Sequence, residues 1–214
     1  MKKSIILIAG MPASGKTTLL NILTKDIFKA FPISVDLIQE LLYDTLGFNS
    51  VQERRQIKKA AFSIAIGMAQ TALKNGLVPI LEYPFGNTHK DQLLKSFKET
   101  TFITVRLDLP IESAYERFHK RDLSDKRHPG HFYNQYPIAE GAVPSYQEFD
   151  KYKEAMLTSQ VCEFSLGKTL AVNADIFPLP IKHILSYVNM CLSEHTNEGE
   201  NNRFKHSTTD TRSL

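Results

Sequence analysis

Eight residues near the start of the chain, 10–17, carry its most specific chemical signal. They read GMPASGKT, with Gly10 and Gly15 followed by Lys16 and Thr17, and they fit the spacing G-x-x-x-x-G-K-[ST]. Glycine adopts backbone conformations that other residues avoid, so the main-chain amides of such a loop can turn inward around an anion. An ammonium group and a hydroxyl complete the loop. The pattern predicts a site for the phosphates of a nucleoside triphosphate bound with Mg²⁺.

Each residue of this loop has an expected contact. Lys16 would reach the β- and γ-phosphates, the Thr17 hydroxyl would bind Mg²⁺, and Thr18 would contact the α-phosphate. The predicted nucleotide-binding residues are Gly10, Ala13, Ser14, Gly15, Lys16, Thr17 and Thr18. The alternative is a glycine-rich turn with a solvated lysine. The complete match directly after an apolar stretch favours phosphate binding.

Two acidic residues are candidates for the chemistry that such a phosphate site needs. Asp36 follows the segment ISV and could accept a proton from an acceptor hydroxyl; alternatively, it caps the helix that follows. Glu82 ends the apolar run LVPIL, where a carboxylate could hold Mg²⁺ or its waters. Its alternatives are a charge at the end of a strand or a contact to substrate. We predict that Asp36 is catalytic and that Glu82, with Thr17, serves the metal.

A basic segment, RFHKRDLSDKRHPGH at 117–131, follows later in the chain. Arginines that close over phosphates stabilise the charge on a transferred group and exclude water. We predict this role for Arg121 and Arg127, alongside Lys16, whereas Arg117 is expected to belong to a solvated helix face. The two histidines of HPGH lack a nearby third metal ligand. They are expected to contact the acceptor or phosphate, or to be ordinary loop residues.

The elements that must position these side chains alternate between strands and helices. Short apolar runs typical of buried parallel strands and stretches with helical spacing follow each other through the chain, with strands predicted at 4–9, 31–36, 77–81, 101–109 and 170–175. Residues 122–144 form a long polar loop, and such loops are often functional. One P-loop kinase domain is therefore predicted over residues 1–193, with a lid at about 117–144. A polar tail, 194–214, is predicted to be disordered.

The composition narrows the setting. The chain has 214 residues, which suits one α/β domain, and its net charge of +3 is too small to indicate a nucleic-acid binder by itself. No apolar stretch approaches the roughly 20 residues of a membrane-spanning helix. The two cysteines lack the spacing of a metal or redox site. We predict a cytoplasmic protein with no membrane partner, and the oligomeric state stays open.

In this order, the segments GMPASGKTT, ISVD, ILEYPF, RFHKRD and LAVNAD resemble the small P-loop kinases grouped around polynucleotide kinase and zeta toxin. The resemblance spans about residues 4–190. It implies a P-loop NTPase fold: a three-layer α/β/α sandwich with a parallel sheet of order 2-3-1-4-5 and a helical lid. It also implies that Asp36 activates the hydroxyl, that Arg121 or Arg127 is a lid arginine, and that the loop after LAVNAD lies near adenine.

The sequence therefore predicts an ATP- and Mg²⁺-dependent kinase that phosphorylates a hydroxyl of a small molecule. A GTPase is disfavoured because VNAD at 172–175 lacks the lysine of the guanine-reading N-K-x-D pattern. The alternatives are a polynucleotide 5′-hydroxyl kinase, a zeta toxin-like kinase of amino-sugar nucleotides, and a nucleotide-binding regulatory module without transferase activity. Nucleic acid is a less favoured partner than a small molecule.

Overall fold

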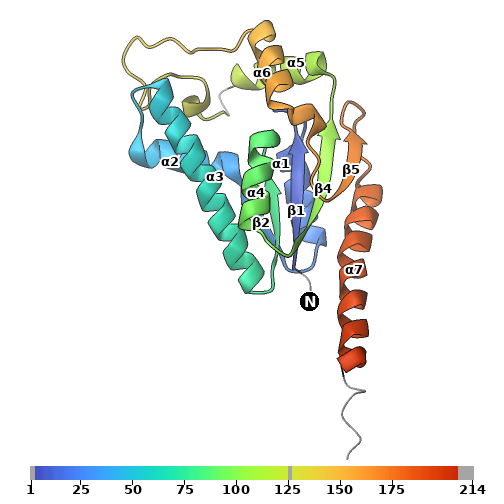
Figure 1. Ribbon diagram of the computed structural model, residues 1–214. Helices are drawn as coiled ribbons and strands as arrows, with labels where there is room; N and C mark the ends of the chain where they lie inside the picture. The colour runs from blue at the N-terminus through green and yellow to red at the C-terminus, as the bar shows by residue number, and fades with distance from the viewer. Residues whose placement is uncertain (1–2, 125–126, 207–214) are drawn as a thin grey trace, which may run out of the picture.

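A central strand organises the computed structural model, which describes residues 3–124 and 127–206 (Figure 1). This strand, β1 (Lys3–Gly10), is buried along almost its whole length, as its apolar sequence predicts. It lies in the middle of a five-stranded sheet of order β2-β3-β1-β4-β5. Every pairing in the sheet is parallel, and the other strands are β2 (Ala30–Ser34), β3 (Val78–Glu82), β4 (Thr100–Asp108) and β5 (Lys168–Asn173). The predicted sheet order is confirmed.

Helices cover both faces of this sheet, because the side chains of a strand alternate between its two faces. Ile6 and Ile8 of β1 pack on one side with α1 (Lys16–Asp26) and α7 (Ile181–His206). On the other side, Ile5 and Leu7 pack in a core with α3 (Val51–Lys74) and α4 (Asn87–Ser96). The predicted three-layer α/β/α sandwich is therefore confirmed.

A smaller unit beside the sheet positions one wall of the site. Helix α2 (Val35–Leu46) connects β2 to the loop before α3, and the Ser34 hydroxyl caps it by accepting a 3.4 Å hydrogen bond from the N–H of Leu37. Tyr43 and Phe48 are fully buried between α2 and α3 with Ile57. This small core fixes α2, and therefore Asp36 in its first turn, against the N-terminal half of α3.

Helices α5 (Ile111–Asp122) and α6 (Phe149–Ser159) pack above the carboxyl ends of the strands (Figure 1). The predicted lid, at about 117–144, takes in the end of α5 and the short 3₁₀ turn η1 (Pro129–His131), and a second 3₁₀ turn, η2 (Val161–Glu163), follows α6. Tyr152 of α6 is fully buried and packs with Ala114 of α5 and Met11 of the glycine loop. Helices α5 and α6 therefore share a small apolar core with the glycine loop beneath them.

The end of the chain differs from the predicted tail. Helix α7 continues to His206, so residues 194–206, expected to be disordered, extend the helix that the apolar residues before them anchor to the sheet. Adding a turn to an existing helix is far less costly than starting one. Residues 207–214 of the predicted tail lie outside the described residues.

Among the helices that the structure describes, not one combines the length and the apolar character needed to cross a lipid bilayer.

Candidate active site

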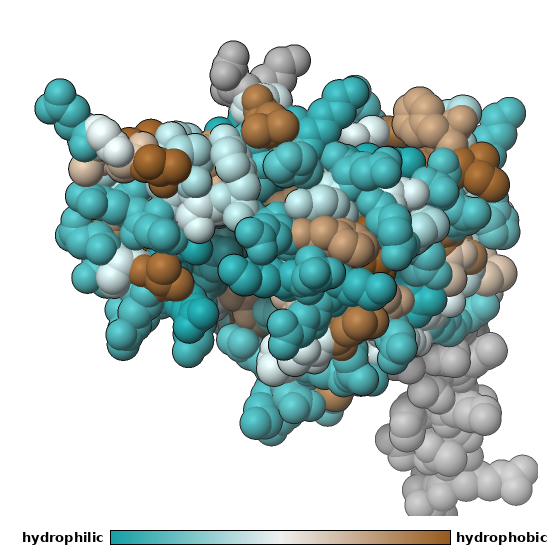
Figure 2. All heavy atoms as spheres, turned by 90° about the horizontal axis from the view of Figure 1, so that it is seen from above, coloured by the Kyte–Doolittle hydropathy of each residue, from teal (hydrophilic) through white to brown (hydrophobic). Residues whose placement is uncertain are grey.

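A cavity of about 800 Å³ lies between the glycine loop, the ends of β2 and β3, and the lid. The face above the strands is mainly hydrophilic and is recessed near its centre (Figure 2). Polar and charged side chains line the cavity, including Lys16, Asp36, Glu82, Arg121 and Arg127. Parallel strands place their carboxyl ends at one edge of a sheet, which is why residues so distant in sequence meet here.

The glycine loop follows β1 directly and leads into α1. Gly10 has φ 138° and Gly15 φ 94°, values that favour glycine over residues with a side chain. A Cβ at Gly10 would lie 2.6 Å from the carbonyl oxygen of Leu107 on the neighbouring strand, whereas nothing lies within 4 Å of a Cβ at Gly15. Gly10 is thus required by close packing, and Gly15 by the turn into the helix.

The loop brings most of the predicted nucleotide-binding residues to the cavity, but not all of them. The ones that line it are Ala13, Gly15, Lys16, Thr17 and Thr18. Ser14 is buried beneath the loop, near Gly10. Gly10 and Ser14 therefore lie on the side of the loop that faces the protein interior.

Lys16 lies at the floor of the cavity. Its Nζ donates a 2.9 Å hydrogen bond to the carbonyl oxygen of Met11, within the same loop. Burial lowers the pKa of Lys16, and the negative charges of Glu82 and Asp36 oppose that shift. A desolvated ammonium group gains strongly from an anion placed beside it, as the predicted phosphate contact requires.

Thr17 and Glu82 form the predicted metal pair. The Thr17 hydroxyl donates a 3.2 Å hydrogen bond to Oε1 of Glu82. Glu82 is buried, burial raises the pKa of its carboxyl group, and Oε2 has no hydrogen bond to the described residues. A buried carboxylate beside a hydroxyl suits a divalent cation that also takes phosphate oxygens.

The donor set fits Mg²⁺ better than a metal held by protein alone. Within residues 3–124 and 127–206, no group of three or more histidine, cysteine, aspartate or glutamate side chains is placed to hold a metal ion. Mg²⁺ commonly binds through one or two protein oxygens together with substrate phosphates and water. Thr17 and Glu82 are the residues that would hold it here.

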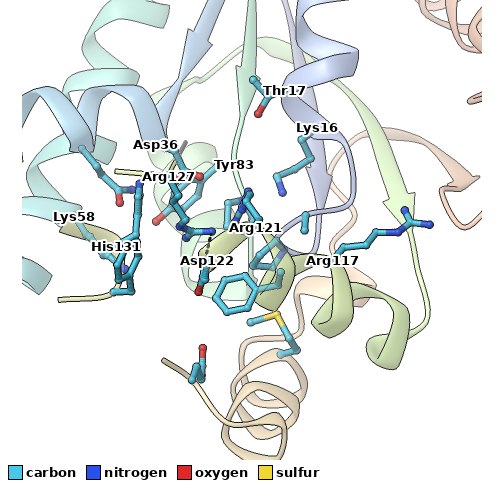
Figure 3. Close-up of a pocket in the computed structure, with 18 of the residues that line it drawn as sticks. Lys16, Thr17, Asp36, Lys58, Tyr83, Arg117, Arg121, Asp122, Arg127 and His131 are labelled. Carbon is cyan, nitrogen blue, oxygen red and sulfur yellow. Dashed lines mark ion pairs between the residues drawn. The ribbon is translucent and has the colours of Figure 1, made fainter. Parts of the chain in front are cut away.

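Asp36 lies across the cavity from the glycine loop, in the first turn of α2 (Figure 3). It does not cap that helix, because Ser34 does. The alternative that Asp36 caps the helix is therefore wrong. Its negative charge acts to raise the pKa of both Lys16 and Tyr83. Tyr83 is mostly buried beside it, and burial raises the pKa of its hydroxyl to about 12.

The two predicted lid arginines also reach the cavity. Arg127 pairs with Asp122, with Nη1 and Oδ1 2.8 Å apart, and both side chains are largely buried. Burial raises the pKa of Asp122 and lowers that of Arg127. The guanidinium groups of Arg127 and Arg121 lie 5.1 Å and 5.8 Å from the centre of the Phe118 ring. Stacking on this ring holds both cations at the cavity wall.

Arg117 points away from these two arginines (Figure 3). It donates a 3.0 Å hydrogen bond to the carbonyl oxygen of Ala174 and pairs with Asp175 at 3.2 Å. These partners directly follow β5 and are the last two residues of LAVNAD, so Arg117 connects α5 to the end of that segment. Arg117, predicted to lie on a solvated helix face, is thus half exposed and has hydrogen-bond and ion-pair partners.

The segment after Arg127 is anchored to α2 and α3. His131 Nε2 lies 2.8 Å from Oε1 of Glu40, and His128 Nε2 lies 3.0 Å from Oδ1 of Asp44. Phe48 and Tyr136 exchange two backbone hydrogen bonds of 2.7 Å and 2.8 Å. Both histidines contact acids of α2, and only His131 also lines the cavity. This part of the predicted lid therefore packs with the α2 and α3 wall.

On the wall formed by α2 and α3, the sequence analysis missed three cavity residues. Gln39 is buried in α2, while Arg54 and Lys58 lie one turn apart on α3. Arg54 Nη1 donates hydrogen bonds to the carbonyl oxygens of Tyr133 at 2.7 Å and His131 at 3.4 Å. The i, i+4 spacing of the two cations was the available signal, but in ERRQIKK it resembles a solvated helix face.

Comparison with known proteins gives the family. Residues 2–138 match the family described as adenylylsulphate kinase. An adenylyl-sulfate kinase of Thermodesulfovibrio yellowstonii is 25% identical over 125 residues, which cover 56% of this chain and 60% of the relative. The chain thus matches about 60% of the length of this curated relative.

Solved structures give the same fold. A candidate kinase from Chloroflexus aurantiacus superposes with a TM-score of 0.69 at 24% identity, covering 89% of this chain and 98% of its own. A gluconokinase from Sinorhizobium meliloti gives 0.51 at 14% identity over 95% and 97% of the two chains. A shikimate kinase from Bacteroides thetaiotaomicron gives 0.51 at 14% over 89% and 98%.

These comparisons support a P-loop kinase and do not confirm the narrower resemblance to polynucleotide kinase and zeta toxin. The matched region contains the glycine loop, Asp36, Glu82 and both lid arginines. Since the match extends over more than half of the sequence, the chain belongs to the adenylylsulphate kinase family.

Proposed function

We propose that this protein is an ATP- and Mg²⁺-dependent kinase that phosphorylates a hydroxyl group of a small, anionic acceptor. The observation that carries this proposal is that one cavity contains Lys16 on the glycine loop and Asp36 on the opposite wall. The first suits the phosphates of ATP, and the second suits the hydroxyl that attacks them. Family membership and the kinase fold support the same activity.

Asp36 would act on the acceptor and the cations on the transferred group. The acceptor oxygen attacks the γ-phosphorus, its proton passes to the Asp36 carboxylate, and the bond to the β–γ bridging oxygen breaks to release ADP. Lys16, Arg121 and Arg127 would stabilise the charge on the phosphoryl oxygens. Mg²⁺ held by Thr17 and Glu82 would neutralise phosphate charge.

The positive charges on the α3 wall of the cavity indicate an anionic acceptor. Arg54 and Lys58 line the cavity from α3, and within the described residues neither forms an ion pair with a carboxylate. Burial lowers the pKa of Lys58. A cation that is desolvated and has no carboxylate partner favours a ligand that brings a negative charge.

The matched relative is named for an acceptor of this kind, adenylyl sulfate. That compound carries hydroxyl groups and a negatively charged phosphate–sulfate group, so it is the first acceptor to test. Gluconate and shikimate, the carboxylate compounds that name two of the structural neighbours, complete an anionic panel.

The decisive measurement follows label from γ-labelled ATP and Mg²⁺ to this panel, with a 5′-hydroxyl oligonucleotide included. We expect label on a small anionic compound. In Asp36→Asn, kcat should fall about 10²- to 10⁴-fold while ATP affinity is retained. Asp91→Asn, an exposed aspartate on α4, is the matched control.

Two outcomes would contradict the proposal. Label on the oligonucleotide alone would indicate a polynucleotide 5′-hydroxyl kinase. ATP binding without transfer to any acceptor would favour a regulatory module.

The acceptor charge has its own test. Lys58→Met should raise the acceptor KM by about tenfold or more, the size expected for a charge-assisted hydrogen bond, and should leave the KM for ATP unchanged. Lys74→Met removes an exposed lysine at the end of the same helix, away from the cavity, and should change neither constant.

A further inference from the structure

A second cavity, of about 470 Å³, adjoins the wall that carries Lys58. It lies between α3 and α4, and it shares Lys58 and Tyr83 with the larger cavity. Because both residues line both spaces, a ligand group bound at Lys58 lies at the entrance to the second cavity. Nothing in the proposed phosphoryl transfer uses this space.

Aromatic rings form the interior of the second cavity. The ring centres of Phe62 and His89 are 4.8 Å apart, those of Tyr83 and His89 5.1 Å, and those of Phe62 and Tyr83 5.6 Å. The first two pairs are edge-to-face, a favourable packing for aromatic groups. Rings held in this way present a preformed apolar surface to a flat ligand.

His89 supplies a polar atom of defined character at this surface. Its Nδ1 accepts a 3.0 Å hydrogen bond from the N–H of Gly86, so the proton of the neutral ring is on Nε2. Burial lowers the pKa of His89, which favours the neutral ring. Nε2 has no hydrogen-bond partner among the described residues. It is therefore a donor available to a ligand.

Polar side chains complete the rim. Ser63 of α3, and Thr88 and Gln92 of α4, are exposed and line the opening. The Ser63 hydroxyl donates a hydrogen bond to the carbonyl oxygen of Lys59 in its own helix. It does not pair with the Nε2–H of His89. An apolar interior with a few placed polar groups is the usual make-up of a small-molecule site.

We propose that this second cavity is an extension of the acceptor site and that it binds an aromatic ring attached to the anionic group held at Lys58. This assignment rests on the proposed function, because the anion at Lys58 belongs to the acceptor. Phe62, Tyr83 and His89 contact the ring faces and edges, and the Nε2–H of His89 donates to a hydrogen-bond acceptor on the ring.

The test compares two probes that differ by the ring, α-naphthyl phosphate and methyl phosphate. Both are titrated into the full chain with Mg²⁺ and a saturating non-hydrolysable ATP analogue, so that the glycine loop is occupied. We expect naphthyl phosphate to bind at least about tenfold more tightly, from the apolar area that the ring buries. It should also shift the NMR signal of the His89 ring.

Two variants fill the second cavity from exposed positions, Ser63→Trp and Gln92→Trp. Either should remove the preference for the naphthyl ring and leave methyl phosphate binding unchanged. Thr71→Trp is the matched control, since Thr71 is also exposed on α3 and its hydroxyl likewise bonds to the carbonyl four residues before it. It should keep the preference.

The outcomes separate the two proposals. Equal affinity for both probes, or a preference that survives both filling variants, would overturn the ring site and leave the anionic acceptor in place. If neither probe binds, the anion site at Lys58 is wrong and the ring site fails with it.

Discussion

The hydroxyl of Thr17, at the start of α1, donates a 3.2 Å hydrogen bond to Oε1 of Glu82, at the end of β3. The two residues are 65 positions apart in the chain, and the sheet brings them together because β1 and β3 are parallel neighbours with Ile8 opposite Glu82. This contact joins the phosphate loop to the carboxylate of the adjacent strand. It is the structural basis of the proposed Mg²⁺ site.

The first prediction concerns this pair. Glu82→Gln removes the charge but keeps the shape of the side chain, and Thr17→Val removes the hydroxyl. Each should lower kcat/KM by about 10²- to 10³-fold, the range seen when one electrostatic contact to a transition state is lost. The loss should depend on the Mg²⁺ concentration, as measured in a coupled ADP-release assay. Thr17→Ser, which keeps the hydroxyl, should stay active, and an inactive serine variant would argue against the metal role.

The second prediction separates the two glycines of the loop. Gly10→Ala introduces a methyl group 2.6 Å from the Leu107 carbonyl oxygen, so β1 and β4 must move apart; Gly15→Ala meets no atom within 4 Å. Both variants carry backbone strain of about 1–3 kcal/mol, and only Gly10→Ala adds the clash. The melting temperature should therefore fall further for Gly10→Ala in differential scanning calorimetry. An equal fall in melting temperature for both variants would show that the contact between Gly10 and Leu107 adds no further cost.

The third prediction concerns the buried ion pair between Asp122 and Arg127. Arg127→Ala leaves the carboxylate of Asp122 buried without its partner, which should destabilise the protein by about 3–5 kcal/mol in urea unfolding. Adding Asp122→Asn to that variant removes the unpaired charge and should recover part of the loss. Catalysis should not recover with stability, because the cation at the cavity is still missing. Full recovery of kcat in the double variant would exclude a catalytic role for Arg127.

The fourth prediction is a pH dependence of stability. Burial lowers the pKa of His131 in the folded protein, although Glu40 lies 2.8 Å from its Nε2 and opposes that shift. The unfolded chain therefore binds a proton more readily, and the free energy of unfolding should decrease as the pH falls below about 6.5. The slope from one such group is at most about 1.4 kcal/mol per pH unit.

The variant His131→Gln tests the source of this effect in urea unfolding between pH 5.5 and 7.5. Its unfolding free energy should vary less with pH than that of the wild type. A residual dependence is expected from His89, whose pKa burial also lowers. An unchanged slope in His131→Gln would mean that this histidine is not desolvated as described.

The local features of this protein can be predicted from its sequence alone. The spacing of Gly10, Gly15, Lys16 and Thr17 specifies a phosphate loop because backbone geometry and charge there depend on a few adjacent residues. The apolar runs likewise predict the strands and their parallel arrangement, and the resemblance of short motifs predicts the strand order that the structure has. Asp36 and Glu82 were identified as candidates because each follows such a run, and Arg121 and Arg127 because they belong to a basic segment.

Only the tertiary structure decided what surrounds these groups. Arg54 and Lys58 resemble surface charges in the sequence, and they face the cavity because the small core around Tyr43 and Phe48 orients α3. The same packing attaches the segment of His128 and His131 to α2. Burial, ion pairing and cavity shape depend on contacts between residues distant in the chain. The local periodicity of the sequence does not specify those contacts.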